Sequence, residues 1–256
     1  MTASLPDLRL AVVSDIHGNL PALRAVADDI ARRGCEQVLD CGDLLSGPLW
    51  PAETCAWLRA RAWPTVAGNH ERQLLACARQ PGERADMLAY HALDAPALAW
   101  LAALPRQLRP HPDVLMIHGR PDSDIEYLLE SVGADAGAQG VRMASDSELR
   151  ERLRCLPATP SLLLCGHSHQ ARVVGVADTL LVNPGSVGLP AFDDEHGGHH
   201  CIESGSPHAR YALCERRGGR WSAALVAVDY DWEQAAARAA AADMPDWARW
   251  LRSGRN

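Results

Sequence analysis

Residues 8–19 read LRLAVVSDIHGN, a short apolar run that ends in ligand-type side chains. The run is bounded by polar residues and has the length of a buried strand, which we expect over residues 8–14. Asp15 and His17 follow directly at its carboxyl end. A helix is expected over residues 21–34, because a proline opens this stretch and a glycine closes it. The sequence therefore predicts a strand, a polar loop and a helix in succession.

Strand and helix signals continue to alternate through the first third of the chain. Strands are expected over residues 38–41 and 65–67, with a helix over residues 51–61 between them. The middle of the chain then reads as helical, with an interruption at Pro96, and strand signals dominate its later part. An opening of this order predicts parallel strands with helices packed on them.

No internal repeat or linker is visible, so we expect a single domain over residues 1–256. Residues 191–209 are polar and glycine-rich, which predicts a mobile loop insertion. Residues 231–256 are rich in alanine and carry Trp247 and Trp250, which predicts a C-terminal helical segment packed on the domain. Alternatively, these helices cover a functional site or form the contact surface of a homodimer.

The composition excludes several classes of protein. An apolar share of 47% is that of an ordinary folded domain. The formal net charge of −7 and the lack of a basic run argue against a nucleic-acid partner, except as a small or terminal substrate. No apolar stretch approaches the roughly 18 residues that span a membrane, so no membrane partner is expected. The amino-terminal sequence lacks signal-peptide features and the cysteines form no CxxC pair, which predicts a reduced, cytoplasmic protein.

Five short polar sites each follow a strand signal. They are Ser14-Asp15-Ile16-His17-Gly18-Asn19, Cys41-Gly42-Asp43, Ala67-Gly68-Asn69-His70-Glu71, Ile117-His118-Gly119 and Cys165-Gly166-His167-Ser168-His169. Because the carboxyl ends of parallel strands meet at one edge of a sheet, the five sites are expected to converge. Mixed His, Asp and Asn ligands suit divalent Mn, Fe, Co, Ni or Zn. Each motif alone is commonplace, but the five together predict a metal centre.

The order D-x-H, G-D, G-N-H-E, H and G-H-x-H resembles that of the calcineurin-like metallophosphoesterases, in particular their compact bacterial phosphodiesterase branch. The resemblance implies an α/β fold, a four-layer αββα sandwich in which two mixed β-sheets are flanked by helices. It implies that one metal ion is held by Asp15, His17 and His169. It implies that a second ion is held by Asn69, His118 and His167, with Asp43 bridging both ions and His70 facing the substrate as the catalytic residue.

The reaction implied by the resemblance is the hydrolysis of phosphoester bonds, phosphodiesters above all. A metal-bridging hydroxide attacks in line with the leaving oxygen, and His70 assists the leaving group. A bridging carboxylate such as Asp43 offsets the mutual repulsion of two divalent ions, which lie about 3.5–4 Å apart in such sites. The expected partner is therefore a small phosphoester substrate.

Two other functions remain as alternatives. A phosphomonoesterase or protein phosphatase would use the same metal site, but Gly42-Asp43 lacks the Asp-Arg-Gly continuation of serine/threonine phosphatases, and Asn69 lacks their preceding Arg-Gly. Two arginines that grip a terminal phosphate are thus missing, which favours diesters. A non-catalytic scaffold of this fold would lose ligands or the catalytic histidine, and this chain retains them all.

Several further residues are candidates for supporting roles. Asn19 and Arg120 are candidate substrate contacts, although Asn19 reads equally well as a helix cap and Arg120 as a surface residue. Asp40 and Glu71 are candidates to orient imidazoles. The turn at residues 183–186 is expected to support the loop of the G-H-x-H motif, and its alternative role is to offer main-chain N–H groups to an anion. Solvation in a loop is expected for His196, His199 and His200, with binding of an extra ion or contact with substrate as the alternative.

Overall fold

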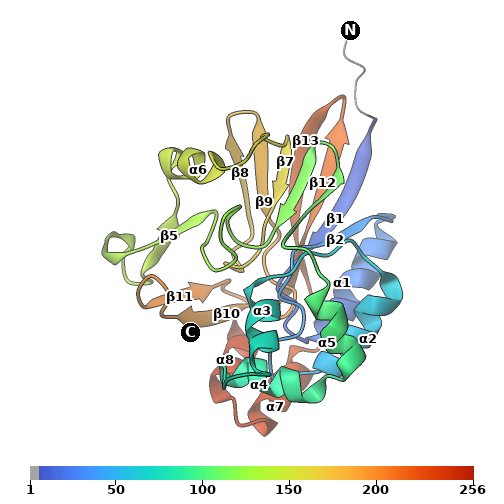
Figure 1. Cartoon of the computed structure of the whole chain (residues 1–256), viewed down its shortest axis with the longest axis vertical. Coiled ribbons are helices and arrows are strands. Elements are labelled where there is room, and N and C mark those ends of the chain that lie inside the picture. Colours follow the sequence, from blue (N-terminus) through green and yellow to red (C-terminus); the bar gives the residue numbers. More distant parts are fainter. Residues whose placement is uncertain (1–5) are drawn as a thin grey trace.

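Two mixed β-sheets face one another in the computed structural model, which describes residues 6–256 (Figure 1). The first sheet has the order β13 (Arg220–Val228), β12 (Ala209–Arg217), β1 (Leu8–Val13) and β2 (Val38–Asp40). The second has the order β3 (Gln107–His111), β4 (Val114–Ile117), β7 (Leu162–Leu164), β9 (Thr179–Asn183) and β8 (Arg172–Val176). β1 and β2 are parallel, as are β4, β7 and β9, and the remaining pairs are antiparallel.

Side chains of β1 alternate between two hydrophobic cores. Leu10 and Val12 belong to the core between the sheets, together with side chains of the second sheet such as Met116. Ala11 and Val13 belong to the core between the first sheet and its helices. Successive side chains of a strand point to opposite faces, so a strand buried on both faces must be apolar throughout. The apolar stretch Leu10–Val13 thus produces an inner strand.

Helices cover the outer faces of both sheets. The helices that contribute to the core of the first sheet are α1 (Leu20–Arg32), α2 (Pro51–Arg61), α3 (Asn69–Ala76), α4 (Arg84–Ala92), α5 (Ala95–Ala102), α7 (Trp232–Ala241) and α8 (Pro245–Ser253). On the second sheet, α6 (Asp146–Leu153) packs Leu149 and Leu153 against Leu163. This order of layers confirms the predicted αββα sandwich.

Three local predictions differ from the structure. The strand expected over residues 65–67 is reduced to one bridge between Thr65 and Asp40, because the chain turns at once into α3. β3 was not expected at all: the sequence His111-Pro112-Asp113 reads as a breaker, but it forms the turn of the β3–β4 hairpin. The helical interruption expected at Pro96 lies just before it, between α4 and α5. Pro96 itself lies in the first turn of α5, where its missing N–H costs no hydrogen bond.

The segment 191–209, expected as a loop, contains a hairpin of β10 (Ala191–Asp194) and β11 (His200–Glu203). Its polar composition hides a strand alternation in which His200 and Ile202 are buried. A second hairpin joins β5 (Glu130–Val132) to β6 (Val141–Met143) around a short 3-10 helix (Ala134–Ala136). Both hairpins lie beside the sandwich rather than in its sheets (Figure 1).

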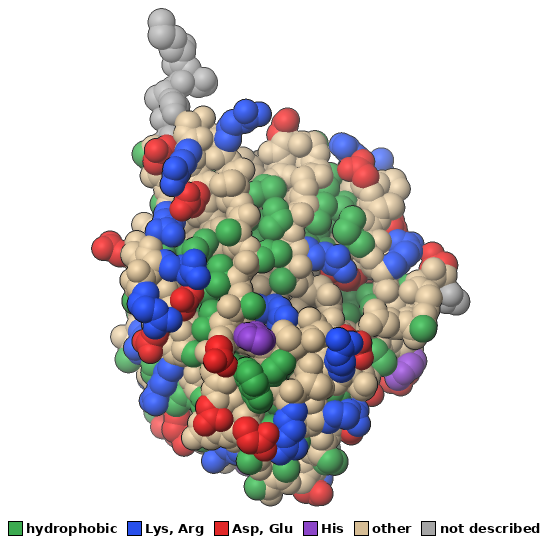
Figure 2. All heavy atoms as spheres, turned by 180° about the vertical axis from the view of Figure 1, so that it is seen from behind, with side chains coloured by type: hydrophobic (Ala, Val, Ile, Leu, Met, Phe, Trp, Pro, Cys, Tyr) green, Lys and Arg blue, Asp and Glu red, His purple; other side chains and the backbone are tan. Residues whose placement is uncertain are grey.

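The surface of the molecule mixes charges of both signs. On the face seen in Figure 2, arginines and acidic side chains are intermingled, and no stripe of one sign is visible on that part of the described chain. Over residues 6–256, no helix combines the length and the apolar character needed to cross a membrane.

Candidate metal centre

The five polar sites converge at the carboxyl ends of strands from both sheets. They bring together two groups of three buried side chains, and within each group the potential ligand atoms lie within 4.8 Å of one another. One group comprises Asp15, His17 and His169. The other comprises Asp43, His118 and His167. The six residues come from four separate loops and meet although they lie up to about 150 positions apart in the chain.

In the first group, Nε2 of His17 lies 3.2 Å from Nε2 of His169, which in turn lies 3.4 Å from Oδ1 of Asp15. Main-chain carbonyls orient the two rings by accepting hydrogen bonds from Nδ1, the other nitrogen of each ring. Nδ1 of His17 donates to the carbonyl of Ser46 at 3.0 Å, and Nδ1 of His169 donates to that of Leu189 at 2.6 Å. Because a carbonyl accepts only from an N–H, each Nε2 carries a free lone pair.

In the second group, Nε2 of His118 lies 3.0 Å from Oδ2 of Asp43 and 3.0 Å from Oδ1 of Asn69. Its Nδ1 donates to the carbonyl of Cys41 at 2.7 Å. The amide of Asn69 is oriented by Gln73, whose Oε1 accepts from Nδ2 at 3.0 Å. The Asn69 oxygen therefore faces the same space as the imidazole and the carboxylate.

Five of these side chains are carried by residues in the left-handed backbone region, which non-glycine residues rarely adopt. Their φ values are 55° for Asp15, 49° for His17, 57° for Asp43, 69° for His167 and 53° for His169. Such conformations cost about 1–3 kcal/mol each and cluster at functional sites. The surrounding structure must therefore hold these loops in place.

The loops are held by hydrogen bonds from the turn after β9. Oγ of Ser186 donates to the carbonyl of Asp15 at 2.7 Å, and the amide N–H of Gly188 donates to the same carbonyl at 3.0 Å. Nδ2 of Asn183 donates to the carbonyl of Gly166 at 2.7 Å and to Oγ of Ser168 at 3.1 Å. The turn at 183–186 thus supports the loop after β1 as well as the expected G-H-x-H loop.

Close packing leaves no room for a side chain at several glycines near the ligand-type residues, and Gly68 and Gly166 are two examples. A Cβ added to Gly68 would lie 2.2 Å from Oδ1 of Asp43, and one added to Gly166 would lie 1.9 Å from Oγ of Ser14. Both distances are far below van der Waals contact. The glycines beside the ligand-type residues therefore allow neighbouring loops to approach each other.

Burial and mutual charge determine the protonation of the site. Burial lowers the pKa of His17 to about 3 and that of His167 to about 4, and neighbouring imidazoles add to both shifts. Burial alone would raise the pKa of Asp43, but His118 and other nearby imidazoles hold it well below its usual range. Burial lowers and Asp43 raises the pKa of His118, which rises to about 9. Neutral imidazoles and an ionised carboxylate are the forms that bind metal ions. His17, His167 and Asp43 are already in those forms, whereas His118 would release a proton when an ion binds.

These residues fit divalent metal ions. Nε2 of His167 is buried and has no hydrogen-bond partner among the described residues. The lone pairs of His17 and His169 face one another at 3.2 Å, an arrangement that a cation between them stabilises. Imidazole, carboxylate and amide donors suit borderline or hard ions. Each group offers the three or four ligands that such a centre needs.

His70 lies beside the second group but takes no part in it. The main-chain N–H of His70 donates to Oδ1 of Asp43 at 2.9 Å, which orients the carboxylate. Nδ1 of its ring pairs with Oδ1 of Asp86 at 2.9 Å, and this carboxylate is buried. The ring is partly exposed, so Nε2 is the nitrogen available to a substrate. Asp86 lies on α4 without a motif around it, and no signal in the sequence pointed to it.

Five of the seven candidate ligands line a cleft of about 550 Å³ together with His70; they are His17, Asp43, Asn69, His167 and His169. Residues 192–196 of the β10–β11 hairpin form one part of its wall, and Trp247 and Trp250 of α8 form another. Both tryptophans also belong to the core of the first sheet. The C-terminal helices therefore pack on the sandwich and contribute to the site.

The candidate substrate contacts lie elsewhere. Asn19 is fully buried: it caps α1 by accepting from the N–H of Ala22, and its Nδ2 donates to Gly188 and Tyr230. Asn19 is therefore the N-terminal cap of α1, as the second of its two interpretations had it. Arg120 forms a bidentate pair with Asp122 and is not among the residues that line the cleft.

Glu71 and Asp40, expected to orient imidazoles, make other contacts instead. Glu71 orients no imidazole; it accepts from the main-chain N–H groups of Gly68, Asp43 and Leu44 and so ties two loops together. Asp40 accepts from the N–H of Gly42. The imidazoles are oriented by main-chain carbonyls instead, which no side-chain pattern reveals.

The three histidines of the hairpin segment have different surroundings. His196 and His199 lie on the surface and pair with Glu126 and Glu195. His200 is buried, and its Nε2 lies 2.8 Å from the hydroxyl of Tyr127. The expectation of solvated histidines thus fails for His200, because the hairpin turns this residue inward.

A sandwich of two mixed sheets with buried His and Asp groups at its strand ends defines a metallophosphoesterase. The chain belongs to the calcineurin-like phosphoesterase superfamily, whose domain matches residues 8–203. It is 25% identical to an uncharacterised protein of Methanocaldococcus jannaschii, over 93% of this chain and 94% of the relative.

Two solved structures share the fold. A metallophosphoesterase from Sphaerobacter thermophilus superposes with a TM-score of 0.69 at 23% identity, covering 96% of this chain and 99% of that one. A hypothetical protein from Pyrococcus horikoshii superposes with a TM-score of 0.73 at 16% identity, covering 96% and 98%.

Proposed function

We propose that this protein is a dinuclear-metal phosphodiesterase that acts on small substrates. The observation that carries the proposal is the pair of buried ligand groups beside His70 in one cleft. Two divalent ions held there would neutralise charge on the phosphoryl oxygens and lower the pKa of a water molecule that attacks in line with the leaving oxygen. Mn, Fe, Ni, Co and Zn are the ions that the donor set admits.

His70 is proposed to donate a proton to the leaving oxygen. Asp86 pairs with Nδ1 at 2.9 Å, and this carboxylate keeps the ring protonated at that atom and fixed in orientation. Nε2 then faces the cleft, where general acids contribute about 10²–10⁴-fold to such reactions. Its position beside Asp43, rather than within a ligand group, supports this role.

The charge of the cleft supports a diester rather than a monoester. Among the described residues, neither arginine nor lysine lines the cleft, whereas Glu83, Asp193 and Glu195 do. A phosphomonoester carries nearly two negative charges at neutral pH, and its terminal oxygens need a cationic clamp beyond the ions. A phosphodiester carries only one charge and needs none.

The test compares substrates and variants of the metal-loaded protein. The chelated protein is reloaded with each ion in turn and assayed on bis(4-nitrophenyl) phosphate, 4-nitrophenyl phosphate and a natural diester with an alkoxide leaving group. We expect the diesters to be preferred. His70→Ala should lose about 10²–10⁴-fold on the natural diester and much less on the activated one. The matched control is His91→Ala, because His91 is exposed and lies outside the cleft.

The alternatives give different outcomes. Faster turnover of the monoester would make the protein a phosphomonoesterase. Bound metal without turnover of any substrate would make it a scaffold. Full activity of His70→Ala on the natural diester would remove the proton-donor role and leave the metal-dependent reaction in place.

A further inference from the structure

The β10–β11 hairpin contacts one histidine of the G-H-x-H loop directly and the other through a single intermediate residue. Phe192, on β10, packs against the ring of His169, with 4.6 Å between the ring centroids and 64° between the ring planes. The ring centroid of Tyr127 lies 4.8 Å from that of His167, and Tyr127 in turn contacts the hairpin. Because His169 belongs to the first ligand group and His167 to the second, each group has one such contact.

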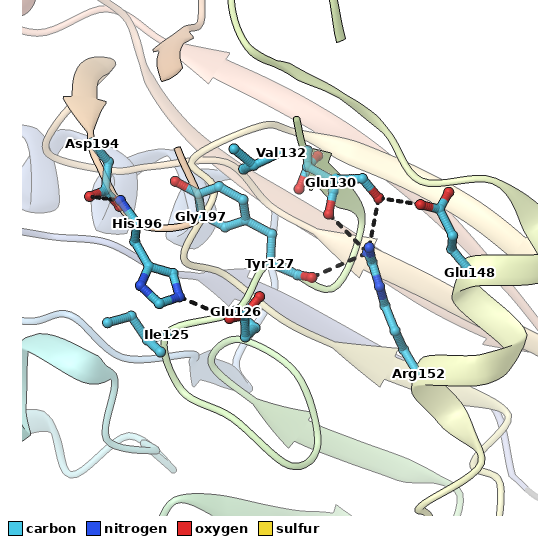
Figure 3. A pocket seen from close by; sticks show the side chains of 11 residues that line it. Ile125, Glu126, Tyr127, Glu130, Val132, Glu148, Arg152, Asp194, His196 and Gly197 are labelled. Carbon is cyan, nitrogen blue, oxygen red and sulfur yellow. Dashed lines mark hydrogen bonds and ion pairs between the residues drawn. The ribbon is translucent and has the colours of Figure 1, made fainter. Parts of the chain in front are cut away.

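Tyr127 is held by a buried hydrogen bond to the hairpin. Its hydroxyl lies 2.8 Å from Nε2 of His200, on β11, and both side chains are buried. Nδ1 of His200 donates to the carbonyl of Gly198 at 2.8 Å, so in the neutral ring Nε2 accepts and the hydroxyl donates. Figure 3 shows the ring of Tyr127 reaching from its loop toward the hairpin turn. On the surface, His196 of this turn pairs with Glu126.

The hydrogen bond gives this contact a direction that apolar packing lacks. Hydrogen bonds weaken steeply away from their preferred angle, so the hydroxyl of Tyr127 is held at one place on His200. The ring that carries the hydroxyl is therefore held at one place against His167. Tyr127 is buried, yet it belongs to none of the hydrophobic cores of the described chain. Its contacts with the two histidines thus account for its burial better than core packing does.

The direction of each imidazole decides whether its lone pair meets an ion. Groups that fix the orientation of a metal-binding histidine change metal affinity about 10–100-fold. Phe192 lies three residues after Leu189, whose carbonyl accepts from Nδ1 of His169, so one segment meets this ring twice. Packing of Tyr127 against the other ring restricts the direction of Nε2 of His167, which is buried and has no partner among the described residues.

We propose that the hairpin positions the two histidines for metal binding, with one contact serving each ion. Phe192 sets the ring of His169 for the first ion. His200, acting through Tyr127, sets the ring of His167 for the second. Phe192, Tyr127 and His200 are positioning residues, because none of them belongs to a ligand group. The inference rests on the dinuclear centre of the proposed function.

The experiment titrates the chelated protein with Mn²⁺ and counts the unbound ion by its EPR signal. We expect two ions to bind to the wild-type protein. Phe192→Leu removes the ring, Tyr127→Phe the hydroxyl and His200→Leu the acceptor, and each should weaken one ion about 10–100-fold. His200→Gln should restore the affinity, because its amide oxygen can accept from the hydroxyl in place of Nε2. His199→Gln is the matched control, since His199 is exposed and pairs with Glu195 on the surface.

Two single-site backgrounds identify the ion that each contact serves. His169→Gln leaves only the second ligand group intact, and His167→Gln leaves only the first. In the His169→Gln background, His200→Leu should weaken the remaining ion and Phe192→Leu should not. In the His167→Gln background, the two effects should be exchanged. Loss of affinity in both backgrounds from one hairpin variant would overturn the proposal, because a general loosening of the loop weakens both ions.

The results for the hairpin and for the reaction are separate. Unchanged binding of two ions by every hairpin variant would overturn the positioning role and leave the dinuclear centre standing. The expected affinities without hydrolysis of any phosphodiester would support the positioning role and overturn the phosphodiesterase. A wild-type protein that binds fewer than two ions would overturn both the dinuclear centre and the assignment of one contact to each ion. Tyr127→Phe removes a single oxygen, so it decides the second contact where His200→Leu does not fold.

Discussion

The carboxylate of Asp86 lies 2.9 Å from Nδ1 of His70 and is buried beneath it. Asp86→Asn keeps the shape of the side chain but removes the charge that holds the ring proton. We expect kcat on a diester with a poor leaving group to fall about 10–100-fold, as for other residues that orient a functional histidine. Activity on bis(4-nitrophenyl) phosphate should fall much less, because its leaving group needs no proton. An equal loss on both substrates would show that Asp86 serves the structure rather than His70.

Gly68→Ala should disrupt the metal centre. The added Cβ would lie 2.2 Å from Oδ1 of Asp43, so the loop or the carboxylate must move. We expect metal affinity, measured by titration of the chelated protein with Mn²⁺, to fall at least about tenfold. Gly175→Ala is the control, because a Cβ there meets nothing within 4 Å. Equal affinity in both variants would show that the two loops need not approach so closely.

Metal removal should lower the stability of the fold. The strained loops after β1, β2 and β7 hold buried ligand-type side chains, and Nε2 of His167 has no hydrogen-bond partner among the described residues. An ion that binds only the folded chain stabilises it by about 2.7 kcal/mol at a hundred times its Kd. Thermal unfolding of the chelated protein should therefore occur at a lower Tm than that of the reloaded protein. The difference should shrink in His167→Gln and persist in His111→Gln, which alters an exposed pair with Gln37. An unchanged Tm on reloading would contradict the metal centre.

Acid stability should depend on Asp113. Burial alone would raise its pKa, but hydrogen bonds from Arg216, Trp221 and Ser161 lower it below the ordinary pKa of an aspartate, 3.8. Since the pKa is lower in the folded state, the stabilisation is present above pH ~4 and is lost as the pH falls through the folded-state value.

Asp113→Asn should therefore cost about 1–3 kcal/mol at pH 7, because the buried Arg216 loses its charged partner. Urea unfolding at pH 7 and pH 3 should show a smaller difference between wild type and variant at the lower pH. Asp146→Asn, which breaks an exposed pair with Arg150, should have little effect at either pH. A difference that is constant with pH would exclude the ionised carboxylate as its source.

Much of the fold was predictable because its signals are local. The apolar run of β1, the proline that opens α1 and the glycine-rich strand ends depend on nearest neighbours in the chain. The hairpin at β10–β11 was missed, because its inward side chains include His200, which composition alone assigns to solvent. β3 was missed for a related reason: His111-Pro112-Asp113 reads as a breaker, although these residues form the turn between β3 and β4.

The sequence by itself determined the order of the ligand-type residues, their place behind strands and hence the superfamily. Those features follow from short-range chemistry: apolar runs form strands, and polar residues with glycine end them. Only the tertiary structure decided which groups orient the ligand-type side chains and His70. Asp86 and the carbonyls of Ser46, Cys41 and Leu189 act through contacts between distant segments. Main-chain carbonyls occur at every residue, so only packing selects the ones that orient an imidazole.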